Sequence, residues 1–346
     1  MNINGLLVCN NLINKNNFLK NTTKACSTIY AKFGYNIYSG SGCFITKDGW
    51  FLTAAHMVIN LHRNDSADKV FICSPKTKKW IASTNFYVDA FADIALVKIN
   101  ETNLPFIKIA NSNIQIRDEC YLCGDPLGVD TTSISKGIVR DNHYTDTDGV
   151  SQIDNILIDT PGFSGNSGSP ILNVRGKIIG LYTFGFTGSE SLGGGANWNT
   201  LQSVIPILKK KQNYTIKKYL GITYSIPSPF TLETKYNKKS FLNRGIVINK
   251  IKNKSPFKKS KMKVGDILLK INTIEIGSMT HQRSPGVFMY KNNSKIKIIY
   301  YDVSQSKKIT EIIDFNVKFN NVNVSEDAPL SGGYSNKIKL IKGIKK

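Results

Sequence analysis

The sequence lacks long apolar runs, internal repeats and low-complexity segments. Its apolar stretches, such as residues 244–251, are interrupted well before the roughly 18 consecutive apolar positions that a membrane-spanning helix requires. Of the 346 residues, 41% are hydrophobic and 20% are charged. This balance excludes a membrane channel and a mainly disordered chain, and the length predicts two domains.

Acidic residues are scarce in the back of the chain. Residues 1–210 hold 19 basic and 16 acidic side chains, whereas residues 211–346 hold 27 basic and 8 acidic ones. A basic half suggests an acidic partner, nucleic acid included, although a solvated lysine-rich surface would have the same composition. The lysine run over residues 250–263 has few interleaved aromatic residues for base stacking, so it predicts at most a non-specific contact with polyanions.

Cysteine is absent after Cys123. A chain of this length does not need disulfides to stabilise its core, which favours a reducing compartment. Cys120 and Cys123 have the C-x-x-C spacing of redox and zinc sites, but no second Cys or His pair stands at a matching spacing. Residues 119–124 are typical of a strand, so we predict buried structural cysteines, no metal site and no cofactor.

The N-terminus lacks the long apolar segment of a signal peptide. No acidic residue precedes Asp48, as in organellar transit peptides, but no arginine precedes Arg63 and asparagine dominates the segment. We therefore expect an intracellular protein, cytoplasmic or virion-associated, with mitochondrial import as the alternative.

Short apolar runs separated by turn-forming residues dominate the front half and predict an all-β domain. The pattern then changes to a helix over residues 200–211, although Pro206 lies inside it. The predicted strands are 27–33, 43–46, 69–73, 94–99, 156–159 and 177–183. The predicted organisation is an N-terminal extension over 1–24, an all-β first domain over 25–211, a linker over 212–218, a second domain over 219–320 and a basic tail over 321–346.

Three separate motifs carry side chains that catalyse reactions together in hydrolases. Gly165–Pro170 (GNSGSP) presents Ser167 on a tight loop, where the glycines permit positive φ values and let backbone N–H groups converge. His56 follows a predicted hairpin, and a neutral imidazole can accept a hydroxyl proton near pH 7. Asp93 opens an apolar strand, where a partly buried carboxylate needs a partner such as an imidazole N–H. Each motif alone also fits a surface turn, a core histidine or a strand cap.

His56, Asp93 and Ser167 occur in the chain order of the chymotrypsin clan, each within that clan's local sequence. The chain resembles a trypsin-like serine protease of the HtrA (Deg) group over roughly residues 25–320. The resemblance implies an all-β, chymotrypsin-like double β-barrel protease domain followed by an α+β PDZ domain. The motifs that carry it are Thr53–His56, Asp93–Leu96, Cys123–Gly128, Gly165–Pro170 and Gly180–Gly185.

The resemblance also implies the roles of the site residues. Ser167 would be the nucleophile, His56 the base and Asp93 its orienting partner, with the N–H groups of Gly165 and Ser167 as the oxyanion hole. The substrate-binding strand would contain Thr183, Phe184 and Gly185, with Thr183 supporting the aspartate and Gly185 pairing with substrate backbone. The pocket-forming segment 160–164 contains no acidic residue, so an apolar P1 side chain is expected rather than Lys or Arg. Ser169 departs from the family's usual second glycine, which predicts some backbone strain.

The basic half resembles the PDZ domain of the same group. Its carboxylate-binding loop would be Tyr219, Leu220, Gly221 and Ile222, whose N–H groups hold a peptide C-terminus while a strand edge pairs with the peptide. Where the groove helix should lie, residues 282–287 include Pro285 and Gly286, which break helices.

Three functions follow as hypotheses. The first is an HtrA-like serine endopeptidase in protein processing or quality control, acting on protein or peptide substrates. The alternatives are a catalytically weak PDZ scaffold and a polyanion-binding or assembly protein. Family analogy further implies a homo-oligomer, with a trimer as the expected state.

Overall fold

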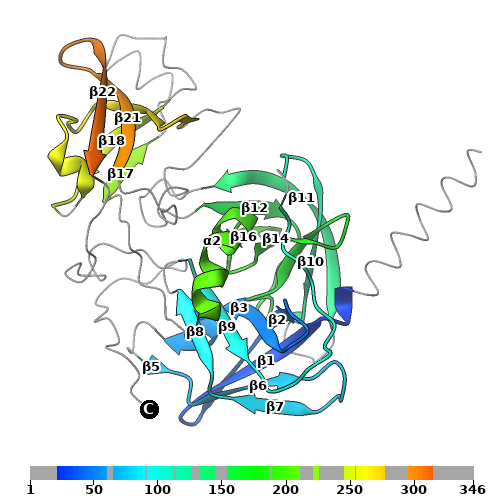
Figure 1. The fold of residues 1–346 in the computed structure, drawn as a ribbon. Coiled ribbons are helices and arrows are strands. Elements are labelled where there is room, and N and C mark those ends of the chain that lie inside the picture. Colours follow the sequence, from blue (N-terminus) through cyan, green and yellow to red (C-terminus); the bar gives the residue numbers. More distant parts are fainter. Residues whose placement is uncertain are drawn as a thin grey trace, which may run out of the picture. The chain divides into compact units, whose positions relative to one another are not determined.

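The structure, a computed structural model, describes residues 22–60, 65–89, 92–111, 114–126, 132–144, 154–186, 189, 191–210, 221–225, 245–253, 255–276 and 295–314. They fall into two compact units, each with its own sheets (Figure 1). The described part of the first unit runs over residues 22–142 and 156–210, and that of the second over 143–144, 154–155 and 221–314. Within these residues, no helix has the length and apolar character needed to span a membrane.

The first sheet holds seven antiparallel strands in the order β7-β6-β1-β2-β3-β9-β8. Both faces of its central strands β3 and β9 are buried, because side chains on one face form the core and helix α2 contacts β9. A small hairpin of β4 (Ile59–Asn60) and β5 (Asp65–Ser66) stands apart from this sheet. The strands are β1 (Cys26–Phe33), β2 (Asn36–Phe44), β3 (Trp50–Ala54), β6 (Lys69–Cys73), β7 (Trp80–Ser83), β8 (Phe86–Asp89) and β9 (Ile94–Lys98).

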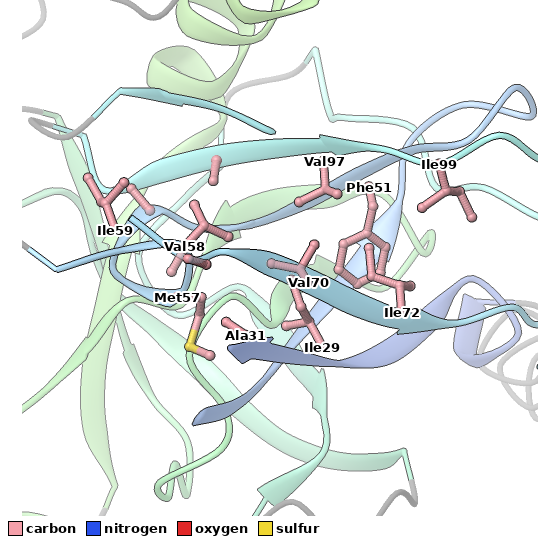
Figure 2. Close-up of a cluster of buried hydrophobic side chains, with 14 of the residues drawn as sticks. Ile29, Ala31, Phe51, Met57, Val58, Ile59, Val70, Ile72, Val97 and Ile99 are labelled. Carbon is pink, nitrogen blue, oxygen red and sulfur yellow. The ribbon is translucent and has the colours of Figure 1, made fainter. Parts of the chain in front are cut away.

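The core of the first sheet is dense in branched and aromatic side chains (Figure 2). Ile29, Val70 and Ile72 are fully buried, and they belong to the antiparallel neighbours β1 and β6. Met57 belongs to the same cluster. Since Met57 directly follows His56, this core anchors the short turn that carries the histidine.

The second sheet also holds seven strands, in the order β14-β13-β10-β11-β12-β16-β15. Its core contains Ile156, Ile158, Ile171 and Ile179 together with Tyr182. These two sheets make up the double β-barrel predicted from the sequence. The strands are β10 (Glu119–Gly124), β11 (Ser133–Tyr144), β12 (Asn155–Asp159), β13 (Pro170–Asn173), β14 (Ile178–Leu181), β15 (Phe184–Gly185) and β16 (Leu192–Ala196).

The predicted helix is present as α2, Trp198–Lys209. It starts two residues before the predicted range because the side chain of Asn197 accepts hydrogen bonds from the N–H groups of Asn199 and Thr200. Pro206 lies inside α2 on an exposed position. The helix contacts β8 and β9 as well as β14, and so packs against strands of both sheets.

The C-x-x-C pair lies on β10 with its side chains on opposite faces. Cys120 joins the core of the second sheet, whereas the thiol of Cys123 forms a hydrogen bond with that of Cys26. That hydrogen bond and burial raise the pKa of the Cys26 thiol well above its ordinary value. Burial likewise raises the pKa of the Cys43 thiol. The described cysteines are all free thiols, and these four pack in the interior as predicted.

The second unit contains a sheet in the order β17-β18-β19-β21-β22, with β20 pairing to β19. Its core includes Val247, Ile267 and Tyr301. The predicted groove-helix segment 282–287 lies outside the described residues, as do Tyr219, Leu220 and the tail over 321–346. The elements are β17 (Ile222–Ser225), β18 (Ile246–Ile251), a 3-10 turn η4 (Pro256–Lys259), β19 (Ile267–Ile271), β20 (Ile274–Glu275), β21 (Lys295–Asp302) and β22 (Lys307–Asp314).

Candidate active site

His56 and Asp93 lie at the ends of two paired strands of the first sheet. Strand β3 ends at Ala54, and the 3-10 turn η1 (Ala55–Met57) carries His56 directly beyond it. Asp93 immediately precedes β9, which pairs with β3 so that Ala54 lies opposite Ile94. The backbone N–H of Ala55 also donates to the Asp93 carbonyl at 3.1 Å. Strand pairing therefore brings two residues 37 positions apart in the chain into contact.

The Asp93 carboxylate binds His56 through both of its oxygens. Oδ2 lies 2.6 Å from His56 Nδ1, and Oδ1 accepts a hydrogen bond from the His56 backbone N–H at 2.8 Å. The short contact assigns the proton to Nδ1 and leaves the lone pair of Nε2 available to accept a proton. The imidazole side chain is 40% exposed and the carboxylate 12%, so the ring has one edge open to solvent and one held by protein.

The pKa of His56 is the result of opposing effects. Desolvation by the surrounding protein lowers the pKa of the imidazole, because it disfavours the charged ring. The negative charge of Asp93 and the hydrogen bond to its carboxylate both raise the pKa, and together they outweigh desolvation. The pKa of His56 is consequently raised from its ordinary value, and Asp93 stabilises the imidazolium that would form when the ring accepts a proton.

Ser167 lies on the loop between β12 and β13, and two glycines shape this loop. Gly165 has φ +97° and Gly168 φ +86°, both in the region that favours glycine. A Cβ on Gly168 would lie 2.3 Å from the Thr53 hydroxyl and 2.8 Å from the Ala54 backbone nitrogen. The serine loop of the second sheet thus packs directly on the end of β3, two residues before His56.

The structure contains the hydrogen bond between His56 and Asp93 but none between Ser167 and His56 among the described residues. Among the described residues, the Ser167 side chain makes no hydrogen bond, to His56 or to any other group. The hydroxyl of Thr183 likewise makes none to Asp93 within the described chain, although Thr183 is buried and its N–H donates to the Gly194 carbonyl. Catalytic hydrogen bonds are often long in enzymes without substrate and shorten when it binds.

Sequence reasoning missed a chain of hydrogen bonds that fixes the serine loop from the first sheet. The Ser41 hydroxyl donates to the Gly165 carbonyl at 2.7 Å and accepts from the Asp125 backbone N–H at 2.8 Å. The Asp125 carboxylate in turn accepts from the Thr28 hydroxyl at 2.6 Å. The Ser41 N–H also donates to the Ser167 carbonyl at 2.8 Å. Ser41 stands between two glycines in the sequence, which was the only local signal of this close approach.

The strain predicted at Ser169 is not present. Ser169 is not among the residues with positive φ, and its side chain is fully buried. Room for it comes from Gly124, where a Cβ would lie only 1.9 Å from Ser169 Oγ. The serine that replaces the family's glycine is therefore accommodated by a glycine on the neighbouring strand β10, which pairs with β13.

The other predicted binding residues lie at two strand edges. Phe184 and Gly185 form β15, at the edge of the second sheet, and pair with Gly194 and Gly193 of β16. Of the predicted carboxylate loop, Gly221 has φ +59° and Ile222 is buried at the start of β17. The described residues contain no group of three or more His, Cys, Asp or Glu side chains that could hold a metal ion.

Comparison with known proteins gives the same two domains. A family model described as a trypsin-like peptidase domain matches residues 40–181, and one described as a PDZ domain matches residues 219–310. The serine endoprotease DegS of Haemophilus influenzae is 28% identical over 288 residues, which cover 80% of this chain and 76% of that protein. The chain therefore has a trypsin-like peptidase domain followed by a PDZ domain, and its relatives include DegP-, DegS- and HtrA-type serine proteases. A solved structure described as the HtrA-type protease AlgW with a tripeptide shares the fold with this chain, with a TM-score of 0.66, 21% identity and coverage of 87% of this chain and 96% of that one.

The relatives also correct the expected location. A probable periplasmic serine endoprotease, DegP-like, of Chlamydia muridarum is 27% identical over 259 residues, or 71% of this chain and 48% of that protein. This chain thus spans about half the length of this relative. Similar proteins of Chlamydia trachomatis and Rickettsia prowazekii have the same periplasmic designation. The expectation of a cytoplasmic or virion-associated protein is therefore wrong, and these relatives point to a periplasmic or secreted location. The cysteine argument failed because free buried thiols do not report the compartment.

Proposed function

We propose that the chain is a serine endopeptidase that hydrolyses peptide bonds in protein substrates, in processing or quality control. Ser167 attacks the scissile carbonyl, His56 accepts the serine proton and returns it to the leaving amine, and Asp93 holds the imidazole in the required tautomer. The observation that carries the proposal is the contact of both Asp93 oxygens with His56, next to a glycine-shaped loop that presents Ser167.

The oxyanion hole in this proposal consists of the N–H groups of Gly165 and Ser167. Neither group donates a hydrogen bond to any residue in the described part of the chain. The hydrogen bond from Ser41 holds the Gly165 carbonyl toward β2. Two unpartnered N–H groups beside a nucleophile are the donors that a tetrahedral intermediate requires.

The decisive experiment compares Ser167→Ala with Ser306→Ala, an exposed serine in the turn between β21 and β22 of the second unit. Casein hydrolysis and labelling by a fluorophosphonate probe are measured together with thermal melting. We expect Ser167→Ala to lose hydrolysis and labelling without a change in melting, because a loop Ser to Ala change costs little stability. Ser306→Ala should retain both activities, and hydrolysis that persists in Ser167→Ala at the wild-type rate refutes the assignment.

We further propose that the PDZ domain binds peptides at the edge of its sheet. Strand β17 pairs with β18 and with no other described strand, so it has one edge available for an added strand. The loop that ends in Gly221 and Ile222 directly precedes β17, where its N–H groups can hold a peptide carboxylate. Binding of a peptide with a free C-terminus, compared with its C-terminal amide, tests this step.

Two alternative functions of this chain do not require hydrolysis. A catalytically weak PDZ scaffold would bind peptides but would not label with the serine probe. A polyanion-binding role rests on exposed lysines such as Lys258, Lys259 and Lys261 in the second unit, and predicts retention on heparin that falls steeply with salt. A homo-oligomer, a trimer by analogy with the family, would be seen as a mass of three chains in solution.

A further inference from the structure

The ring of Tyr182 extends into a space that three glycines leave open. Tyr182 follows β14 and is only 6% exposed, with its ring in the core of the second sheet. Its hydroxyl oxygen lies 2.3 Å from the position of a Cβ on Gly162, 2.5 Å from one on Gly193 and 3.1 Å from one on Gly185. One hydroxyl thus lies closest to three glycines that come from three different segments.

Two of these segments are the ones that the family resemblance assigns to the substrate, and the third pairs with one of them. Gly162 lies in the pocket-forming segment 160–164, three residues before Gly165. Gly185 lies on β15, the strand proposed to pair with substrate backbone, and Gly193 lies directly opposite it on β16. The tyrosine hydroxyl is therefore placed between the walls that would receive the P1 side chain.

The Tyr182 ring can occupy this position only because residues 162 and 193 are glycines. At Gly162 and Gly193 a Cβ would be closer than 3.0 Å to the ring, a distance that side chains do not tolerate. The Tyr182 O–H makes no hydrogen bond within the described part of the chain. Burial alone raises the pKa of Tyr182, so the hydroxyl is un-ionised and can donate a proton. The hydroxyl oxygen is not one of the fully enclosed unpartnered atoms of the described chain, so it remains open to solvent and to a ligand.

We propose that Tyr182 determines the primary specificity of the enzyme. The end of its ring shortens the P1 pocket, so that the pocket accepts alanine or serine and excludes leucine and phenylalanine. Its O–H donates a hydrogen bond to the hydroxyl of a P1 serine. This inference rests on the proposed endopeptidase function, and it narrows the expected apolar P1 preference to the smallest side chains.

The test uses a set of peptides that differ only at P1, with serine, alanine, valine, leucine or phenylalanine. For the wild-type chain, kcat/KM should be at least about tenfold higher for alanine and serine than for leucine, since one or two misplaced methylenes in a pocket change kcat/KM by about that factor or more. Wild-type cleavage after leucine or phenylalanine at the rate for alanine overturns the proposal.

Two variants separate the size of the ring from its hydroxyl. Tyr182→Phe retains the ring, so the alanine-to-leucine ratio should stay unchanged while the serine-to-alanine ratio falls by about tenfold. Tyr182→Val opens the pocket, and leucine should become as good as alanine or better. Unchanged ratios in both variants refute the role of Tyr182. Melting curves check that each variant is folded, and Tyr182→Phe retains the core packing if Tyr182→Val does not fold.

A binding measurement distinguishes failure of this inference from failure of the proposed function. The same peptides are titrated into Ser167→Ala and into the double variant with Tyr182→Val, neither of which needs to hydrolyse them. If the wild-type chain proves inactive but Ser167→Ala still binds the alanine peptide more tightly than the leucine peptide, the role of Tyr182 stands and the endopeptidase assignment fails. If the probe labels Ser167 but neither hydrolysis nor binding distinguishes the peptides, the endopeptidase assignment stands and the role of Tyr182 fails.

Discussion

Asp93 has a backbone conformation that few residues other than glycine adopt, with φ +52°. Aspartate tolerates this region better than most residues, because its short carboxylate can bond to nearby backbone groups. Here Oδ1 accepts the His56 N–H, and the carbonyl of Asp93 accepts the N–H of Ala55. The conformation is therefore stabilised by the same contacts that orient the histidine, and strain of this kind is typical of functional sites.

The His56–Asp93 contact predicts the pH dependence of hydrolysis. His56 must be neutral to accept the serine proton, and its pKa is raised from the ordinary value of about 6.5. The rate should therefore increase with pH and reach half of its maximum above pH about 6.5. A kcat/KM profile measured with a small peptide from pH 5 to 9 checks this, and a midpoint below that value contradicts it.

Asp93→Asn should lower kcat by about 10⁴, because the asparagine would hold His56 in the wrong tautomer.

Gly124 predicts a stability effect at a residue outside the catalytic set. A Cβ there would lie 1.9 Å from Ser169 Oγ and 2.7 Å from Asn166 Oδ1, so Gly124→Ala overpacks the loop next to the nucleophile. We expect a loss of about 1 to 3 kcal/mol in the free energy of unfolding, measured by urea denaturation. Adding Ser169→Gly removes the closest contact and should restore part of the loss. Equal losses in the single and double variants would show that Ser169 is not the neighbour that matters.

At the scale of elements, helix α2 links the two sheets through its N-terminus. Asn197 is fully buried, caps the helix through Oδ1 and donates from its amide nitrogen to the Asn142 carbonyl on β11 at 3.0 Å. The helix as a whole contacts β8 and β9 as well as β14, so the cap positions an element that packs against both sheets. Asn197 thus joins the start of α2 to β11, 55 positions earlier in the chain.

Asn197→Ala removes the cap and leaves the Asn142 carbonyl without this donor. We expect the free energy of unfolding to fall by at least about 1 kcal/mol, the usual effect of losing a cap. Asn197→Asp is the matched comparison, because its carboxylate can still accept from the first turn although it cannot donate to Asn142. Thermal or urea unfolding of both variants should rank wild type, Asp and Ala in decreasing stability. An alanine variant as stable as the aspartate variant contradicts the capping role.

The sequence predicted elements wherever a local pattern specifies them. The predicted strand over residues 69–73 corresponds to β6 and that over 94–99 to β9, because short β-branched runs between turn residues are a local signal. The predicted strand over 43–46 covered only the end of β2, whose first three residues, Asn36–Tyr38, are exposed although two of them are apolar. The bond between Ser41 and Gly165 joins residues 124 positions apart, and the position of the Tyr182 hydroxyl depends on three segments at once. No local pattern contains such contacts.

At the scale of the whole molecule, the charge surplus lies in the second half of the chain. We compare Lys258→Gln, Lys259→Gln and Lys261→Gln combined with a control that carries Lys47→Gln, Lys76→Gln and Lys79→Gln. All six lysines are exposed, so both triple variants remove the same charge. If polyanions bind the basic half, the first variant should elute from heparin at clearly lower salt than the control, since fewer counterions are released. Equal elution of the two variants means that the surplus is only a solvated surface.

The residues of the proposed triad come from segments next to two different sheets. His56 and Asp93 belong to the first sheet, whereas Ser167 belongs to the second and is fixed by Ser41 across the junction. During synthesis, the first sheet emerges from the ribosome while the nucleophile is still untranslated. With the proposed triad, peptidase activity would arise only when the second sheet has folded against the first, so a half-folded chain would have no means of digesting its neighbours. The timing of activity is set by the completion of folding.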